Sequence, residues 1–247
     1  MTTRIALVTG ANRGLGFESA RALAGHGFTV LVGARSAERG QEAAARITAE
    51  GGTARCVPLD VADDASVAAA ADLIGREYGR LDVLINNAGI TTPPDVPPAD
   101  HLPSRTTADT VRRTYETNVF GAIRTIGALL PLLREAPAAR IVNVSSGLGS
   151  LTIGSDRTHP YHALNFLPYC SSKTALNGVT LAYAKELADT PIKVNSADPG
   201  YCATDLNGHS GVRKAEEGAA DIVRLALLDA DGPTGGFYGE GGERLPW

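Results

Sequence analysis

Short, continuously apolar runs alternate along the chain with longer segments in which apolar residues recur at helical spacing. Such runs indicate strands buried on both faces, and strands that alternate with helices predict a parallel sheet. The expected strands are residues 4–9, 28–34, 54–60, 81–86, 140–145, 192–197 and 236–239. The expected helices run from the glycine-rich turn to about 26, over 37–50, from 63 or 64 to 78, from about 107 to 134, after 169, and over 215–229.

No linker or composition break divides this pattern. We therefore expect a single α/β domain over residues 1–247, with a Rossmann-type doubly wound parallel sheet of about seven strands and helices on both faces. Pro131 should kink or close the helix that contains it. Two segments stand apart from the regular alternation, an insert at about 148–168 and a polar, glycine-containing loop at about 205–214. Such a loop is expected to contact substrate and to move as a lid.

Composition narrows the class of protein. The 247 residues are 43 % hydrophobic, which is enough for a large core, and the net charge of −4 argues against a nucleic-acid-binding protein. No run reaches the ~18 apolar residues of a membrane span, and the first residues do not resemble a signal peptide. Cys56, Cys170 and Cys202 lack metal-ligand spacing. These features favour a cytoplasmic protein with reduced thiols, no metal site, and neither a membrane nor a nucleic acid as partner.

A glycine-rich turn follows the first expected strand. Gly10 permits a tight turn, and Gly14 and Gly16 allow backbone to approach a pyrophosphate while the following helix packs on the strand. The helix N-terminus adds free amide groups and a positive dipole end. Because the turn lies at the first strand–helix junction of a doubly wound pattern, it indicates a dinucleotide site.

A phenol and an ammonium group lie one helical turn apart later in the chain. Tyr169 and Lys173 are four residues apart, so they share a helix face. A free phenol has a pKa near about 10, and a neighbouring cation is expected to lower the pKa of Tyr169 toward neutrality. Ser145 and Ser146 end a strand, where a hydroxyl group can hold a carbonyl oxygen against the phenol. The arrangement indicates proton transfer at a carbonyl or alcohol oxygen.

These features occur in the order seen in short-chain dehydrogenases/reductases, and the resemblance covers essentially the whole chain. The C-terminal half resembles the NADPH-dependent carbonyl reductase branch. The resemblance implies an enzyme that reduces a ketone or aldehyde to an alcohol with NADPH. The motifs that carry it are Thr9-Gly-x-x-x-Gly14-x-Gly16, Asn86-Asn87-Ala88-Gly89, Asn118, Ser146, Tyr169-x-x-x-Lys173, and Asp198-Pro199-Gly200-Tyr201 through Thr204-Asp205.

The resemblance also implies roles for individual residues. Tyr169 would be the proton donor, Lys173 would lower its pKa and bind the nicotinamide ribose, and Ser146, the second serine of the pair, would orient the substrate oxygen. Asn118 would hold a water in a proton relay, although a helix-interior asparagine also commonly bonds locally. The implied cofactor-binding residues are Gly10, Asn12, Arg13, Gly14, Leu15, Gly16, Arg35, Asp60, Val61, Asn87, Ala88, Gly89, Tyr169, Lys173, Pro199, Gly200 and Thr204.

The charge of the residue that follows the second expected strand predicts whether the chain prefers NADPH or NADH. Sites that prefer NAD place an acidic residue there for the ribose 2′-hydroxyl group. This chain has Arg35 instead, and Arg13 stands in the glycine-rich turn. Two guanidinium groups suit a 2′-phosphate, so NADPH is expected over NADH.

The spacing before Tyr169 departs from the common family pattern. Ser146 and Tyr169 are 23 residues apart, whereas many members have about a dozen residues between them. Tyr161 in this insert is a rival proton donor, but Asn165 rather than a lysine follows it by four residues. The resemblance implies that carbonyl reductases of this branch carry a longer insert here, which covers a face that other members use to dimerise. The insert of this chain is intermediate in length, so both a monomer and a homo-oligomer stay open.

Two other functions fit the same residues. The first is an NAD(P)-linked alcohol dehydrogenase that works in the oxidative direction, since the same groups serve both directions. The second is a non-catalytic NADP(H)-sensing protein on the same fold. A sensor could dispense with Tyr169 or Lys173, and this chain keeps both.

Overall fold

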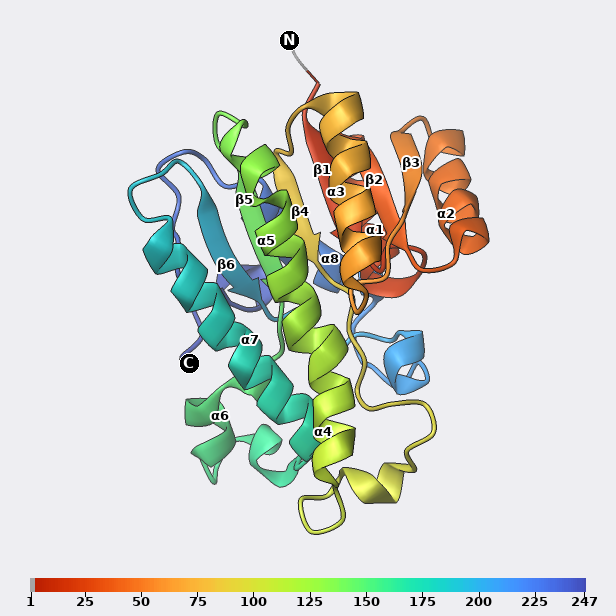
Figure 1. Ribbon diagram of the computed structural model, residues 1–247. Coiled ribbons are helices and arrows are strands. Elements are labelled where there is room, and N and C mark those ends of the chain that lie inside the picture. The colour runs from red at the N-terminus through yellow and green to blue at the C-terminus, as the bar shows by residue number, and fades with distance from the viewer. Residues whose placement is uncertain (1–2) are drawn as a thin grey trace.

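Seven parallel strands form one sheet in the computed structural model, which describes residues 3–247 apart from the side chains at 98 and 99 (Figure 1). The strand order is β3-β2-β1-β4-β5-β6-β7. This confirms the predicted doubly wound fold. The strands are β1 (Ile5–Thr9), β2 (Thr29–Ala34), β3 (Thr53–Pro58), β4 (Val83–Asn86), β5 (Arg140–Val144), β6 (Lys193–Ala197) and β7 (Phe237–Tyr238).

The helices follow the predicted alternation with strands. The α-helices are α1 (Gly14–Gly25), α2 (Ala37–Ala49), α3 (Asp64–Tyr78), α4 (Ala108–Tyr115), α5 (Gly121–Arg134), α6 (Leu151–Ser155), α7 (Leu167–Glu186) and α8 (Ala215–Ala226). Five short 3₁₀ turns are η1 (Pro98–His101), η3 (Gly147–Gly149), η4 (Pro160–Ala163), η5 (Asp205–Asn207) and η6 (Glu240–Gly242), and η2 (Glu116–Phe120) is a π-helical turn. No helix within residues 3–247 is long and apolar enough to cross a membrane.

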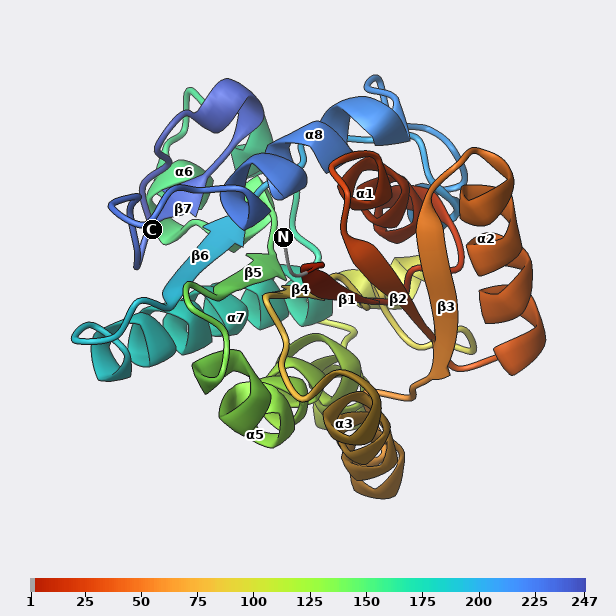
Figure 2. The same cartoon turned by 90° about the horizontal axis from the view of Figure 1, so that it is seen from above.

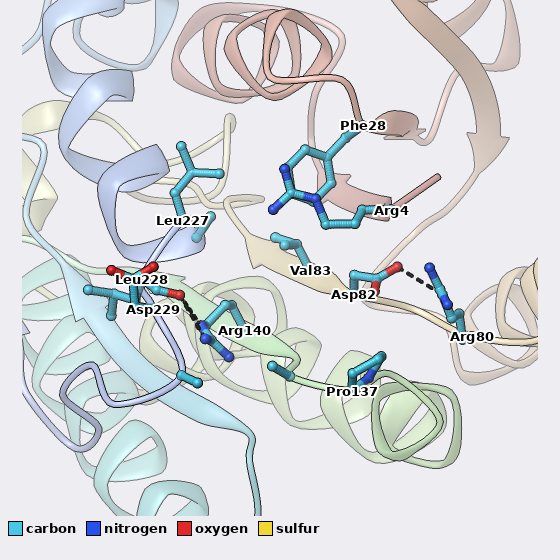
Figure 3. Close-up of a pocket in the computed structure, with 13 residues that line it drawn as sticks. Arg4, Phe28, Arg80, Asp82, Val83, Pro137, Arg140, Leu227, Leu228 and Asp229 are labelled. Atoms are coloured by element: carbon cyan, nitrogen blue, oxygen red, sulfur yellow. Dashed lines mark hydrogen bonds and ion pairs between the residues drawn. The ribbon is translucent and has the colours of Figure 1, made fainter. Parts of the chain in front are cut away.

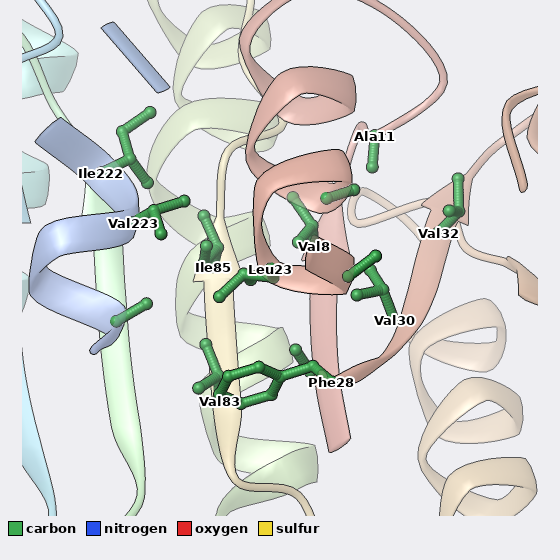
Figure 4. Close-up of a cluster of buried hydrophobic side chains, with 14 of the residues drawn as sticks. Val8, Ala11, Leu23, Phe28, Val30, Val32, Val83, Ile85, Ile222 and Val223 are labelled. Atoms are coloured by element: carbon green, nitrogen blue, oxygen red, sulfur yellow. The ribbon is translucent and has the colours of Figure 1, made fainter. Parts of the chain in front are cut away.

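Two helical layers cover the two faces of the sheet (Figure 2). Helices α1, α2 and α8 pack on one face, where Val8, Val30 and Ile85 meet Leu23 and other apolar side chains (Figure 4). Helices α3, α5 and α7 pack on the other face. Successive residues of β1 alternate between the two cores, as the pleat of a strand requires.

Some predicted boundaries differ from the structure. Helix α7 begins at Leu167, so Tyr169 lies inside its first turn and the helix does not start after it. Pro168 occupies the second helical position, where its missing N–H group costs no helical hydrogen bond. The predicted helix 107–134 is continuous, but its middle is the π-helical turn. Pro131 lies inside α5, which ends within one turn of it at Arg134.

The winding of the chain reverses at β1. From β1 the chain proceeds outward to β2 and β3, and it then returns to add β4 on the opposite side. The connections that leave β1 and β4 therefore separate at the carboxyl edge of the sheet. In open α/β sheets this point is where ligands bind.

A chain of buried polar side chains fixes the last three long strands against helices α5 and α7. Asn86 Nδ2 donates to Asn143 Oδ1 at 2.9 Å, and Thr125 Oγ1 donates to Asn86 Oδ1 at 2.7 Å. Asn143 Nδ2 and Ser196 Oγ both donate to Thr180 Oγ1, at 2.9 and 2.8 Å. Because these atoms are buried, each needs its partner, and the network sets the position of α7 on the sheet.

Replacing the central member of this network should destabilise the fold. Asn143→Ala takes away the acceptor of the buried Asn86 Nδ2 and one of the two donors to Thr180 Oγ1, and we expect a loss of about 2–4 kcal/mol in the free energy of unfolding in urea. Ser19→Ala is the control, because the buried Ser19 Oγ has no hydrogen-bond partner among the described residues. That variant should match or exceed the wild-type stability. Equal losses in both variants would contradict the assigned role of the network.

Candidate active site

The glycine-rich turn is shaped to admit a ligand close to its backbone. Gly10 and Gly14 have φ values of +63° and +56°, which disfavour other residues. A Cβ atom on Gly16 would lie 2.4 Å from Asn87 Nδ2, so the first turn of α1 must pack without a side chain there. Arg13 occupies the N-cap position and its side chain makes no capping hydrogen bond, which leaves the first amide groups of α1 available to an anion.

The end of β4 holds this turn in place. Asn87 Nδ2 donates to the carbonyl oxygen of Thr9 at 2.8 Å, and the backbone amides of Asn87 and Ala88 both donate to Thr9 Oγ1 at 3.0 Å. Asn87 therefore has a structural role at the carboxyl edge of the sheet, and its part in cofactor binding stays a prediction. Thr9 was missed as a functional residue, although a hydroxyl group directly before the glycines was the available signal.

Tyr169, Lys173 and Ser146 meet at the carboxyl edge of the sheet. Ser146 lies beside the Tyr169 side chain and acts to lower its pKa, and Lys173 Nζ lies 5.5 Å from the centre of the Tyr169 ring. Lys173 Nζ donates to the carbonyl oxygen of Val144 at 2.7 Å. Gly89 lies next to the ammonium group, since a Cβ atom there would be in ordinary contact with Nζ at 3.6 Å.

The predicted lowering of the Tyr169 pKa is wrong for this arrangement. Burial raises the pKa of Tyr169, Ser146 opposes that rise, and Asp198 adds to it. Burial also lowers the pKa of Lys173 to about 8, although Asp198 favours its charged form. Desolvation wins because Lys173 is buried and Tyr169 is largely covered by protein.

The neighbours of Ser146 distinguish it from Ser145. Ser145 is buried and its Oγ donates to the backbone carbonyl of Lys173 at 3.4 Å. Ser146 is partly exposed, and besides its contact with Tyr169 its Oγ accepts a hydrogen bond from Leu148 N at 3.3 Å. The geometry favours Ser146 as the residue that meets a substrate oxygen.

Asn118 lies in the π-helical turn η2, and its amide group bonds within the protein. Its Oδ1 accepts from Ile90 N at 2.8 Å, and its Nδ2 donates to Ile90 O at 2.8 Å and to Ser172 Oγ at 2.9 Å. These bonds join the π-helical turn η2 to the loop after β4 and to helix α7. The water-relay role stays a prediction. The π-turn had no sequence signal, although such turns are frequent at functional sites.

A buried carboxyl group that the sequence did not single out for chemistry lies beside the catalytic candidates. Asp198 is 9 % exposed and accepts hydrogen bonds from the backbone amides of Gly200, at 3.0 Å, and Gly147. Burial raises its pKa, while these amides and Arg213 oppose the rise. Its place directly before Pro199-Gly200 at the end of a strand was the available signal. Asp198 thereby joins the turn after β6 to the loop that carries Ser146.

The remaining cofactor candidates lie around the glycine-rich turn or at the next strand ends. Arg35 is exposed and forms no ion pair within residues 3–247, whereas Arg13 Nη1 lies 3.1 Å from Asp205 Oδ2. Thr204 is buried, and its side chain would lie 3.6 Å from a Cβ atom on Gly14. Asn12 and Leu15 are half-buried in the turn, Asp60 and Val61 follow β3, and Pro199 and Gly200 follow β6.

Comparison with known proteins decides the family. A model of the short chain dehydrogenases matches residues 4–215. The chain belongs to the short-chain dehydrogenase/reductase family. It is 40 % identical over 232 residues to the short-chain dehydrogenase anuI of Penicillium roqueforti, covering 92 % of this chain and 89 % of the relative. It is 33 % identical to carbonyl reductase [NADPH] 1 of Sus scrofa, covering 99 % and 98 %.

A solved structure supports the same assignment. The crystal structure of NADPH-bound carbonyl reductase from chicken fatty liver superposes with a TM-score of 0.84 and 27 % identity, covering the whole of both chains. The predicted resemblance to the carbonyl reductase branch and the prediction of an enzyme are therefore confirmed. This short-chain dehydrogenase/reductase is an oxidoreductase.

The insert of this short-chain dehydrogenase/reductase is fastened by the end of the chain. Ser150 Oγ donates to Pro246 O at 2.8 Å, and Thr152 Oγ1 donates to Trp247 O at 2.8 Å. The Trp247 ring stacks on Phe237 with 5.6 Å between centroids. The last residues of the chain and helix α7 thus both hold the segment that follows Ser146.

The rival tyrosine lies beside the loop after Ser146. A Cβ atom on Gly147 would meet the Tyr161 ring at 2.7 Å, and burial raises the pKa of Tyr161. The insert histidines bond locally: His159 Nδ1 accepts from Tyr161 N at 3.1 Å, and His162 Nδ1 lies 2.9 Å from Gly154 O.

A cavity of about 350 Å³ lies at the opposite, amino edge of the sheet (Figure 3). Arg4, Arg80 and Arg140 line it. The Arg140 guanidinium group donates to Leu228 O through Nε at 2.9 Å and Nη2 at 2.7 Å, so it ties β5 to the segment after α8. Ligands of open α/β sheets bind at the carboxyl edge. Neither the glycine-rich turn nor Ser146, Tyr169 or Lys173 lines this cavity. We assign it a structural role.

The Lys173 environment predicts how stability depends on pH. Between its pKa of about 8 in the fold and the ordinary lysine value near about 10.4, the unfolded chain binds a proton that the folded chain does not. Raising the pH through this window should therefore increase the unfolding free energy of the wild type relative to Lys173→Met, by on the order of 2 kcal/mol. Urea unfolding at several pH values across this window tests it, and a constant or falling difference would contradict the buried-ammonium assignment.

Proposed function

We propose that this protein is an NADPH-dependent reductase that converts a ketone or aldehyde to an alcohol, with Tyr169 as the proton donor. The observation that carries the proposal is the meeting of Tyr169, Lys173 and Ser146 beside the glycine-rich turn. Hydride and proton must reach the two ends of one carbonyl bond. A site that reduces a carbonyl therefore needs a dinucleotide cradle and an acid side by side.

The turn and its surroundings fit NADPH. Gly10 and Gly14 adopt positive φ values and carry no side chain that would keep a ligand from the backbone. The free amide groups at the start of α1 suit the pyrophosphate. Arg13 and Arg35 supply positive charge for a 2′-phosphate. The porcine relative is named for NADPH, and the chicken structure contains it. When bound, NADPH supplies the hydride and leaves as NADP⁺.

The residues of the chain supply the proton and the orientation. The Ser146 hydroxyl group holds the carbonyl oxygen next to the Tyr169 hydroxyl group, which gives that oxygen its proton as the carbonyl carbon is reduced. Lys173 is held between Val144 and Gly89, with donors left for the ribose hydroxyl groups and positive charge near the phenolate that forms.

The protonation of the site fits the first step of a reduction. Burial raises the pKa of Tyr169, so the phenol carries its proton at neutral pH. A protonated phenol is ready to donate, whereas oxidation of an alcohol needs the phenolate as a base. The same residues serve both directions, so the choice of reduction rests on the relatives that are named carbonyl reductases.

Removing the phenolic hydroxyl group should abolish turnover and leave cofactor binding intact. In a panel of ketones and aldehydes, with NADPH consumption followed by absorbance, Tyr169→Phe should lose at least about 100-fold in rate, the lower range for a general acid. NADPH affinity measured by titration calorimetry should stay near that of the wild type.

Tyr161→Phe is the matched control, because it removes the other phenol close to Ser146 and should keep most of the activity. If Tyr169→Phe turns over as fast as the wild type, or if Tyr161→Phe is the inactive variant, the proton-donor assignment is wrong. A wild-type chain that binds NADPH but reduces none of the panel would favour a cofactor-sensing protein.

The arginine after β2 should set the preference for the phosphorylated cofactor. Arg35→Ala removes a guanidinium group without disturbing an ion pair, since Arg35 forms none within residues 3–247. We expect the NADPH dissociation constant to rise about tenfold, the size of a charge-assisted contact at an exposed site, and the NADH constant to stay unchanged. Equal weakening of both cofactors would show that Arg35 does not read the 2′-phosphate.

A further inference from the structure

An ion pair fastens the loop 205–214 to the glycine-rich turn. Arg13 Nη1 lies 3.1 Å from Asp205 Oδ2, and the two side chains are 64 % and 43 % exposed. The same segments approach again one residue away, where the Thr204 side chain lies 3.6 Å from the position of a Cβ atom on Gly14. The loop that follows β6 therefore crosses to the turn that starts α1.

His209 is a second partner of Asp205, and its backbone adopts an unfavourable conformation. His209 Nε2 lies 2.9 Å from Asp205 Oδ1. His209 has a φ of +61°, and it is the one residue other than glycine in the described chain with a positive φ. A left-handed conformation costs a non-glycine residue on the order of 1 kcal/mol or more.

The loop closes tightly enough to hold that conformation. His209 N donates to Thr204 O at 2.9 Å, and Asn207 Nδ2 donates to Cys202 O at 2.8 Å. Both Asp205 oxygens are thereby engaged, Oδ2 by Arg13 and Oδ1 by His209. The loop presents one carboxylate to the guanidinium group in the glycine-rich turn.

The two arginines assigned to the 2′-phosphate are not equivalent. Arg35 has no carboxylate partner within residues 3–247, whereas Arg13 already shares its charge with Asp205. A phosphate that needs Arg13 must either displace this carboxylate or bind beside its negative charge. In both cases Asp205 opposes the phosphorylated cofactor more than the unphosphorylated one.

We propose that Asp205 is a specificity-determining residue for the cofactor: it competes with the 2′-phosphate for Arg13, and binding of the phosphorylated cofactor releases the loop 205–214 from the glycine-rich turn. The inference rests on the proposed NADPH function. By linkage, anything that holds the loop against the turn weakens the phosphorylated cofactor, and the cofactor loosens the loop to the same extent.

The decisive measurement is the affinity of Asp205→Asn for NADPH and NADH by titration calorimetry. Because an exposed ion pair is weak, we expect the NADPH dissociation constant to fall roughly two- to fivefold and the NADH constant to stay unchanged. In an Arg13→Met background the same substitution should have no effect, since the carboxylate acts through that guanidinium group. Unchanged or weaker NADPH binding in Asp205→Asn, or an equal gain for NADH, overturns the proposal.

Glu216→Gln controls for the simple loss of a negative charge. Glu216 is an exposed carboxylate in the first turn of α8, just after the loop, and its partner is Arg21 at 3.9 Å instead of Arg13. It should leave the NADPH-to-NADH affinity ratio as in the wild type. A gain in NADPH affinity equal to that of Asp205→Asn would mean that general electrostatics explains the effect, and the proposal would fail.

Hydrogen exchange provides a readout that needs no catalysis. In the cofactor-free protein, Asp205→Asn should exchange faster than the wild type over the loop 205–214, and NADPH should speed exchange there in the wild type. Slower exchange in either case contradicts release of the loop. A wild-type chain that binds NADH more tightly than NADPH would overturn the proposed function, whereas a wild-type preference for NADPH with no gain in Asp205→Asn overturns the present inference alone.

Discussion

The burial of the Lys173 ammonium group is the constraint on which the rest of the active site depends. A charge removed from water must be hydrogen-bonded, and Lys173 Nζ finds the Val144 carbonyl at 2.7 Å where β5 ends. That bond requires α7 to lie close to the sheet, which the Asn143–Thr180 contact also enforces. Tyr169 is one turn earlier on the same helix, so the position of its phenol follows from the position of the lysine.

The local parts of this arrangement could be predicted from the sequence, and the long-range parts could not. Tyr169–Lys173 spacing and the glycine-rich turn are properties of a single helix and a single turn, so their geometry follows from residue order. The alternation of buried strands and helices gave the parallel sheet for the same reason. The direction of the Tyr169 pKa shift was mispredicted, because it depends on how deeply the phenol is covered and on which atom the ammonium group contacts. The contact of Arg13 with Asp205 joins opposite ends of the chain and leaves no pattern in either segment.

Asp198 shows why proximity alone is a poor guide to the electrostatics of a buried site. Its carboxyl group favours the charged form of Lys173 and at the same time opposes ionisation of Tyr169. Arg213 supports this effect, since it favours the ionised form of Asp198 by lowering its pKa, and Arg213 is itself paired with Asp221 at 2.9 Å. The Asp198 carboxylate thus raises the pKa values of both Tyr169 and Lys173. Neither the spacing of these residues nor the order of the motifs predicts this effect.

The protonation pattern that results is the one that proton donation requires. A lysine whose pKa burial has lowered to about 8 keeps its charge at neutral pH by a narrow margin, and Asp198 contributes to that margin. The phenol keeps its proton by a wide margin, because burial and Asp198 act on it in the same direction. As a substrate oxygen gains negative charge, it meets a protonated phenol, a serine hydroxyl group and a cation that are already in place. Desolvation, which first looks adverse to a catalytic tyrosine, therefore holds the acid in the form that reduction consumes.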